Sequence, residues 1–253
     1  MNKFKSIALS ALAALLLSSC SDEPEVTQQT EQVQPLFDTS RFISAADVLG
    51  RIESSEKQWL FDVRNKVSFA ELHIESALSL PYGKFDQKTL ASIEGLSLNS
   101  PIVTYCGCPH TLSGFAAEQI AQFGYTDVRV LHEGFFYWRD NGFPVSGQNA
   151  QVTTRLEFAG TLESHEQPLV NKAVFLRNVR NGQLEAAVTD TNGYFETDFH
   201  VMSFRENDEF QLYLESLDSP ELGRFTASET KLNRISVSNI DQNEPIIQSA
   251  LDY

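Results

Sequence analysis

Hydrophobic and polar positions between residues 41 and 147 alternate between short apolar runs and amphipathic segments. The amphipathic segments have helical spacing. One segment follows a capping box at Ser44 and Asp47. A second segment carries Phe115 and Phe123 on one face and ends at Gly124. The apolar runs have the length of β-strands and cover residues 59–63, 77–81, 101–105 and 128–131; a last short helix is predicted over 135–141. Strands that alternate with helices predict an α/β domain, a parallel sheet with helices on both faces.

Beyond Gly147 the pattern changes, because strand-like runs follow one another without a helical segment between them. Asn181-Gly182 and Asn192-Gly193 are typical of hairpin turns. The runs cover residues 156–162, 173–179, 184–190, 194–199 and 210–215, with a further one from 225 onward. We therefore expect a smaller all-β domain, an antiparallel sandwich, over residues 152–253.

The N-terminus carries a secretory signal, in which Lys3 and Lys5 precede an apolar stretch over residues 7–17. The stretch is shorter than the ~20 residues that a membrane-spanning helix needs. Leu17-Ser18-Ser19-Cys20 resembles the lipobox of bacterial lipoproteins. By that resemblance, residues 1–19 are removed, the Cys20 thiol is acylated, and the acyl chains insert into a lipid bilayer.

Residues 20–40 are acidic and rich in glutamine, which predicts a disordered linker after the lipidated cysteine. Ser21 stands where the lipoprotein retention signal of the inner membrane has aspartate. The resemblance therefore implies a lipid-anchored protein of the cell envelope, in the outer membrane, facing the periplasm or the cell surface.

The net charge is strongly negative. The formal charge of the full chain is −15, and removal of Lys3 and Lys5 with the signal takes it to −15 − 2 = −17. Such a chain is repelled by the phosphates of nucleic acids and anionic lipids, so we expect no nucleic-acid partner.

Cys106 is the main candidate for chemistry. It follows the apolar run 101–105, and an open parallel sheet places its ligand crevice at the carboxyl ends of its strands. Main-chain amides and a helix N-terminus there would lower the pKa of the thiol below its reference of about 8.5 and favour the thiolate. The predicted active-site loop comprises Cys106, Gly107, Cys108, Pro109, His110, Thr111 and Leu112.

Residues 41–147 resemble the rhodanese family of sulfurtransferases. The likeness is carried by Asp62-Val63-Arg64 with His73-Ile74 and Pro81, by Tyr105-Cys106, and by Leu131, Gly134, Trp138, Gly142 and Pro144. It implies that Cys106 is a nucleophile that accepts sulfur from a sulfane-sulfur donor, holds it as a persulfide, and passes it to a thiol or cyanide acceptor. We expect no cofactor.

The loop departs from the family pattern in its charge. Family members usually carry a cation there that binds an anionic donor, whereas residues 107–128 contain neither Arg nor Lys. Thiosulfate would find only amides and His110, and Pro109 removes one amide. Leu72 and Glu133 stand at two further positions where the family has glycine.

Three interpretations of the loop stay open. In the first, Cys106 performs sulfur transfer or thiol redox chemistry, Cys108 resolves the persulfide or closes a strained disulfide, and His110 assists. In the second, the domain is a catalytically inactive rhodanese-like binding module. In the third, Cys106, Cys108 and His110 bind Cu(I) or Zn, although no fourth ligand is evident. Asp62, Arg64 and His73 are predicted to support the loops through hydrogen bonds and ion pairs.

The second domain resembles the regulatory sandwiches of the carboxypeptidase and transthyretin-like type. The resemblance rests on Asn171 to Leu176 and on the segment Thr189-Asp190-Thr191-Asn192-Gly193-Tyr194-Phe195. It implies that Gly193 serves backbone geometry and Phe195 core packing. We expect this domain to bind an envelope protein partner or to position the first domain.

Overall fold

The computed structural model describes residues 36–107, 110–147, 154–201, 204–228 and the backbone of 235–236. The first part contains a 3₁₀ turn (η1, Thr39–Arg41) and the helices α1 (Ala45–Glu53), α2 (Lys66–Glu71), α3 (Gln87–Ala91), α4 (Thr111–Gln122) and α5 (Gly134–Asp140). Its strands are β1 (Phe42–Ile43), β2 (Trp59–Asp62), β3 (His73–Ile74), β4 (Leu78–Ser79), β5 (Ile102–Tyr105), β6 (Val128–Leu131) and β7 (Val145–Ser146).

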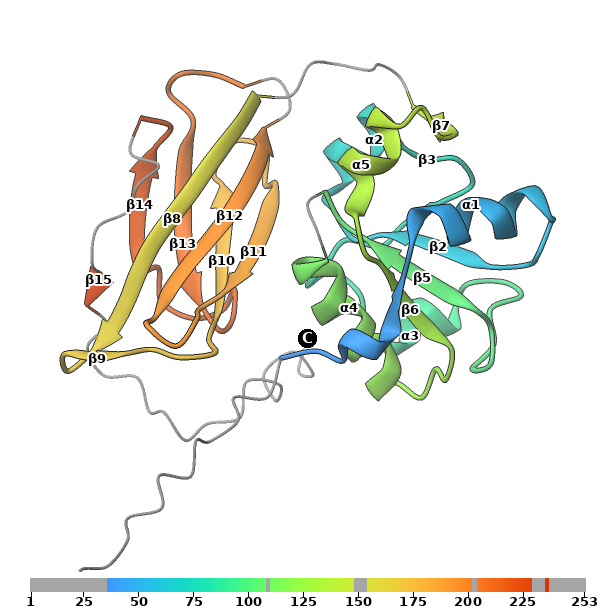
Figure 1. Cartoon of the computed structure of the whole chain (residues 1–253), viewed down its shortest axis with the longest axis horizontal. Helices are drawn as coiled ribbons and strands as arrows, with labels where there is room; N and C mark the ends of the chain where they lie inside the picture. Colours follow the sequence, from blue (N-terminus) through green and yellow to red (C-terminus); the bar gives the residue numbers. More distant parts are fainter. Residues whose placement is uncertain (1–35, 108–109, 148–153, 202–203, 229–234, 237–253) are drawn as a thin grey trace, which may run out of the picture. The chain divides into compact units, whose positions relative to one another are not determined.

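A five-stranded sheet with the order β1-β6-β5-β2-β4 forms the centre of the first domain (Figure 1). Every neighbouring pair in this sheet is parallel. β3 and β7 form a separate antiparallel pair. The predicted parallel α/β domain is therefore confirmed.

Successive side chains of the central strands enter two hydrophobic clusters, one on each face of the sheet. Phe61 and Ile102 belong to a cluster that contains Leu90 of α3 and several α4 side chains. Leu60 and Val103 belong to the other, which contains residues of α1 and α5. Such near-continuous apolar strands are expected when both faces of a sheet are covered.

The helix boundaries follow local chemistry. Ser44 caps α1 as predicted, because its side chain accepts a hydrogen bond from the Asp47 amide. Gly124, with φ of +97°, follows the last turn of α4, the left-handed position where glycine ends helices. The hydrophobic pattern did not predict α2 and α3. Both are short, and their first turns are capped by Asn65 and Asp86.

The second domain consists of two sheets. One has the order β11-β10-β13-β14 and the other the order β12-β8-β15, with β9 paired to β8. The pairs are antiparallel except for β15 with β8. The strands are β8 (Thr154–Ser164), β9 (Gln167–Pro168), β10 (Ala173–Asn178), β11 (Leu184–Val188), β12 (Tyr194–Val201), β13 (Glu209–Leu214), β14 (Gly223–Thr226) and β15 (Ile235–Ser236).

These strands confirm an all-β domain. Side chains of both sheets meet in one hydrophobic cluster, in which Phe158 and Phe199 from one sheet lie with Val174 and Leu212 from the other. Burial of this cluster favours the pairing of the two sheets, since apolar area removed from water contributes about 25 cal/mol per Å².

The two predicted hairpin turns differ in outcome. The Asn181-Gly182 turn joins the antiparallel neighbours β10 and β11, as expected. Asn192-Gly193 also forms a tight turn, but β11 pairs with β10 and β12 pairs with β8, so the chain passes here from one sheet to the other. The hairpin prediction was wrong because the dipeptide sets local chain reversal, whereas the sheet partner is chosen by side-chain burial.

Gly193 serves backbone geometry, as expected. Its φ is +72°, and a Cβ atom would lie 2.3 Å from the carbonyl oxygen of Leu162. Phe195, two residues after Gly193, is fully buried in the shared cluster. A larger residue at position 193 would therefore require both strain and backbone displacement.

The predicted disordered linker is wrong at its C-terminal end. Phe37 packs edge-on against Phe115 with ring centroids 5.6 Å apart, and the Asp38 amide donates to Glu118 of α4. Residues 1–35, which include the predicted signal and Cys20, lie outside the described residues. Within the part that the structure describes, no helix has the length and hydropathy to cross a membrane.

Candidate active site

Cys106 directly follows β5, at the end of the sheet where the sequence placed it. Its Sγ lies 3.4 Å from the hydroxyl of Ser113, in the first turn of α4. The hydroxyl and main-chain N–H of Ser113 both hydrogen-bond the sulfur and favour its ionised form, lowering the pKa. One of the main-chain amides predicted to stabilise the thiolate is therefore present.

Burial nevertheless raises the pKa of Cys106 to about 12. The side chain is 1% exposed and lies in a cluster with Leu112, Ala116 and Ala186. The carboxyl group of Glu185 raises the pKa further by repulsion, and Ser113 offsets only part of both effects. The predicted lowering of the thiol pKa is wrong in this arrangement, because loss of hydration outweighs the local hydrogen bonds.

A cavity of about 240 Å³ opens beside Cys106. Thr111 and Leu112, two residues of the predicted loop, line it together with Cys106. The remaining described lining residues come from the β domain and are Glu185, Ala186, Glu196, Thr197 and Asp198. The site is thus built by two domains, although the sequence analysis assigned it to one.

Glu185 of β11 is a buried carboxyl group at this cavity. Burial raises its pKa to about 8, and the charge of Arg64 counteracts only part of that effect. The carboxyl lies so close to Gly107 that a Cβ there would be 3.1 Å from Glu185 Oε1 and 2.7 Å from the Phe136 ring. Gly107 therefore permits the close approach of the loop to β11.

Glu196 and Asp198 of β12 belong to the same cavity but are more accessible. The Tyr194 hydroxyl donates to Glu196 at 2.7 Å. Asp198 pairs with Arg155 at 2.9 Å, and Arg155 also pairs with Glu157 at 3.2 Å. One cation is therefore shared by two carboxylates.

Asp62 and Arg64 form a buried ion pair at the end of β2. Arg64 Nη2 donates to Asp62 Oδ2 at 2.6 Å and to the Leu72 carbonyl at 2.6 Å. The guanidinium also lies 3.9 Å from the centroid of the Phe135 ring. His73, the third residue of the predicted support, stacks on Phe69 and contacts its carbonyl through Nδ1 at 2.7 Å.

His110 precedes α4 in the left-handed conformation, with φ of +45°. Its ring packs against Phe42 and His132, and its Nδ1 lies 3.3 Å from the His132 carbonyl. Burial lowers its pKa, which disfavours the protonated form. His110 is not among the described residues that line the Cys106 cavity.

Cys108 and Pro109 lie outside the described residues, so the roles predicted for them stay predictions. Within the described ranges, no group of three His, Cys, Asp or Glu side chains is arranged to hold a metal ion. Because Cys108 was one of the three ligands considered for Cu(I) or Zn, that interpretation also stays a prediction.

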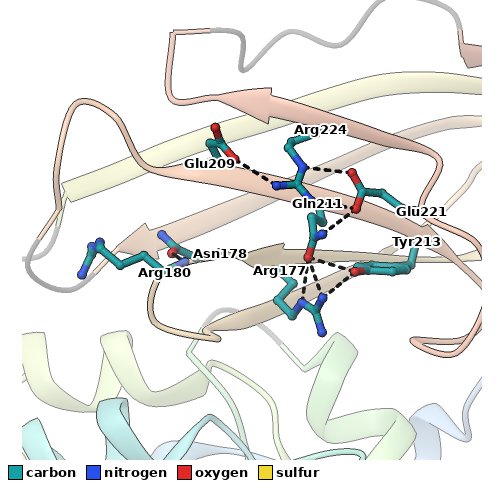
Figure 2. A network of polar contacts seen from close by, with 8 residues as sticks. All are labelled: Arg177, Asn178, Arg180, Glu209, Gln211, Tyr213, Glu221 and Arg224. Atoms are coloured by element: carbon teal, nitrogen blue, oxygen red, sulfur yellow. Dashed lines mark hydrogen bonds and ion pairs between the residues drawn. The ribbon is translucent and has the colours of Figure 1, made fainter.

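A second cavity of about 600 Å³ has Tyr82, Phe175, the cations Lys84 and Arg177, and the carboxyl groups of Asp86, Glu215 and Asp218 among its lining residues. Figure 2 shows how Arg177 is held: its guanidinium donates to Gln211 Oε1 and to the Tyr213 hydroxyl, both at 2.6 Å. The network continues to the surface through Glu221, Arg224 and Glu209 (Figure 2). Arg177 is therefore fixed by the β domain at this cavity.

Sequence reasoning missed Ser113 and the three carboxylates of the Cys106 cavity. Glu185 could have been identified from the sequence, since it is a charged residue within the apolar run Leu184–Val188. Glu196 and Asp198 could not, because they occupy the polar positions of an ordinary alternating strand.

The comparison with protein families supports the assignment of the first domain. Residues 44–141 match the family model described as Rhodanese-like domain. A relative from Synechocystis sp., the uncharacterized protein slr1261, is 29% identical over 110 residues. The match covers 43% of this chain and 59% of that relative, so the chain spans about three fifths of the relative's length.

Solved structures with similarity to this chain include BH2092 from Bacillus halodurans, at 33% identity and a TM-score of 0.39, covering 43% of this chain and 77% of that one. A thiosulfate sulfurtransferase from Pseudomonas aeruginosa is 25% identical with a TM-score of 0.38, and the match covers 44% of this chain and 20% of that chain. A human single-domain sulfurtransferase is 22% identical with a TM-score of 0.35, and the match covers 40% of this chain and 96% of that chain. On the family match, residues 44–141 are a rhodanese-like domain.

Proposed function

We propose that the protein carries out sulfur transfer or thiol redox chemistry through Cys106. The observation that supports this most directly is the position of the cysteine: it follows a central parallel strand, lines a cavity, and lies within hydrogen-bonding distance of Ser113 at the start of α4. A thiol placed at a cavity by a rhodanese-like domain is suited to covalent catalysis.

The proposed first step transfers one sulfur atom. The thiol loses its proton to water, and the thiolate attacks the outer sulfur of a persulfide donor R–S–SH. The Sγ–S bond forms while the donor S–S bond breaks, and RS⁻ leaves with the bonding electrons and takes up a proton. The net reaction converts Cys106–SH and R–S–SH into Cys106–S–SH and R–SH, without an external oxidant. A thiol or cyanide then accepts the outer sulfur.

Intact mass tests this step on the full chain exposed to glutathione persulfide. We expect a gain of one sulfur that is lost in Cys106→Ser and kept in Cys108→Ser. If Cys108→Ser keeps the adduct but loses turnover with a thiol acceptor, Cys108 acts as a resolving thiol. A gain that survives in Cys106→Ser would contradict the proposal.

A second candidate function is a rhodanese-like binding module without turnover. The burial of Cys106, with a pKa of about 12, favours it because the reactive thiolate is scarce at neutral pH. Absence of any sulfur adduct with glutathione persulfide, inorganic polysulfide and thiosulfate would support the binding module and reject the enzyme.

We also propose, from the signal and lipobox-like residues alone, that Cys20 anchors the protein in the envelope. Metabolic labelling with an alkyne palmitate analogue in the producing cell tests this. Label and membrane association should both disappear in Cys20→Ala, and label that persists would contradict the anchor. We also propose that the β domain binds a protein partner in the envelope. The sandwich arrangement of its two sheets stays a proposal.

A further inference from the structure

The walls of the Cys106 cavity carry charge of one sign. Glu185, Glu196 and Asp198 contribute three carboxyl groups, and none of the described lining residues is Arg or Lys. Rhodanese-like chemistry on an anionic donor would require the opposite arrangement, with a cation beside the nucleophile.

The negative charge of these walls is only partly neutralised. Asp198 shares Arg155 with Glu157, so two carboxylates lie beside one cation here. Glu196 is exposed and accepts its hydrogen bond from a neutral hydroxyl, that of Tyr194, which leaves its charge in place. Glu185 adds a further negative charge whenever it ionises.

The buried cation Arg64 is not among the described residues that line this cavity. Arg64 lies close enough to influence Glu185 electrostatically; its Nη2 is bound to Asp62 and to the Leu72 carbonyl, whereas its buried Nη1 has no hydrogen-bond partner among the described residues. The Asp62–Arg64 pair is neutral as a unit, so it adds no net positive charge beside the cavity.

From this arrangement we propose that the Cys106 cavity selects sulfur donors whose tail is cationic or uncharged and rejects anionic donors such as thiosulfate. The inference rests on the proposed sulfur transfer and specifies its substrate class. In the transfer step RS⁻ leaves beside the carboxylates, so a cationic tail offsets the charge that develops there, whereas an anionic tail adds to the repulsion. A cleft lined by one sign of charge also raises the local concentration of oppositely charged molecules.

Three persulfides that share the same reacting group test the proposal: those of cysteamine, 2-mercaptoethanol and 3-mercaptopropionate. Their tails are cationic, neutral and anionic. We expect the rate of sulfur gain at Cys106, followed by intact mass on the full chain at low salt, to fall in that order. The cationic donor should react about tenfold faster than the anionic one, from charge pairs near a solvated surface.

The double variant Glu196→Gln/Asp198→Asn should reduce this difference severalfold. A matched control, Glu53→Gln/Glu94→Gln, changes the net charge of the chain by the same amount at exposed positions of the first domain and should leave the order of donors unchanged. The control separates the local field of the cavity from the overall negative charge.

The outcomes distinguish the two levels of the proposal. If no donor adds sulfur, the sulfurtransferase function itself fails. If all three donors add sulfur at equal rates, or the anionic donor is fastest, sulfur transfer stands and charge selection is overturned. Equal effects of the two double variants would also overturn it, because the cavity would then have no special influence.

Discussion

The Cys106 cavity and the larger cavity beside Arg177 separate features that an oxyanion-binding sulfurtransferase would need in one place. The smaller one contains the nucleophile Cys106 and three carboxyl groups. The larger one contains the cations Lys84 and Arg177 together with the carboxyl groups of Asp86, Glu215 and Asp218, and no cysteine is among its described lining residues. The fold of the first domain places Cys106 at the end of a central strand, whereas the charged residues around it come from the β domain.

Arg177 and the buried Arg64 are each held in place by specific partners. Arg177 is fixed by Gln211 and Tyr213, and Arg64 by Asp62. Each guanidinium donates to oxygen atoms at hydrogen-bonding distance, so moving one toward Cys106 would leave those acceptors unpaired. The following predictions test this separation, beginning with the largest effect.

The pH dependence of Cys106 alkylation should be the largest effect. Burial raises the pKa of this thiol to about 12, so the thiolate fraction, and with it the rate of reaction with iodoacetamide, should rise about tenfold per pH unit between pH 7 and 10. Peptide mapping by mass spectrometry assigns the modified cysteine. In urea the alkylation rate of the same residue should stop rising above its reference pKa of about 8.5. A plateau below pH 9 in the folded protein would contradict the raised pKa.

Removing the buried carboxyl group should change the pH dependence of stability. The pKa of Glu185 rises from 4.5 to about 8 on folding, so between these values the unfolded chain releases a proton that the folded chain retains. The stability of the wild type therefore falls as pH rises through this window. Relative to the wild type, Glu185→Gln should gain on the order of 3 kcal/mol in unfolding free energy between pH 5 and pH 8.

Urea denaturation at the two pH values measures this gain. Glu196→Gln is the matched control, because Glu196 is an exposed residue of the same cavity and its replacement should add no comparable pH dependence. An equal pH dependence in the wild type and in Glu185→Gln would show that Glu185 does not resist ionisation.

A cation placed at the smaller cavity should bring the two separated features together. Glu196→Lys replaces a carboxylate of the wall by an ammonium group, so we expect thiosulfate to react with Cys106 about tenfold faster than in the wild type. The matched variant Glu94→Lys makes the same charge change on the surface of the first domain. The rate of sulfite release reports the reaction, and equal acceleration by both variants would count against a local effect.

The smallest effect concerns the larger cavity. Arg177→Leu should cost about 1–3 kcal/mol of stability, because Gln211 and Tyr213 lose a charged donor, and should leave the alkylation rate of Cys106 unchanged. Arg129→Leu, which removes a partly exposed ion pair with Asp127, should cost less than about 1 kcal/mol. A changed Cys106 reactivity in Arg177→Leu would show that the two cavities are coupled.

Much of the fold could be predicted because local patterns and burial agree. The apolar runs at residues 59–63 and 101–105 became neighbouring parallel strands, and Ser44 capped the first helix. The turn at Asn192-Gly193 was misassigned for the opposite reason: its dipeptide specifies the local bend, but the partner strand of β12 depends on residues far away in the sequence.

The sequence by itself determined that a cysteine follows a central strand of a rhodanese-like domain, since strand, loop and helix are adjacent in the chain. Only the tertiary structure decided the environment of that cysteine. Glu185 and Asp198 line the cavity of Cys106 from strands about 80 and 90 residues further along the chain, and no local pattern encodes such a long-range arrangement. The pKa of the thiol is thus set by long-range packing, because burial and neighbouring charge act through space.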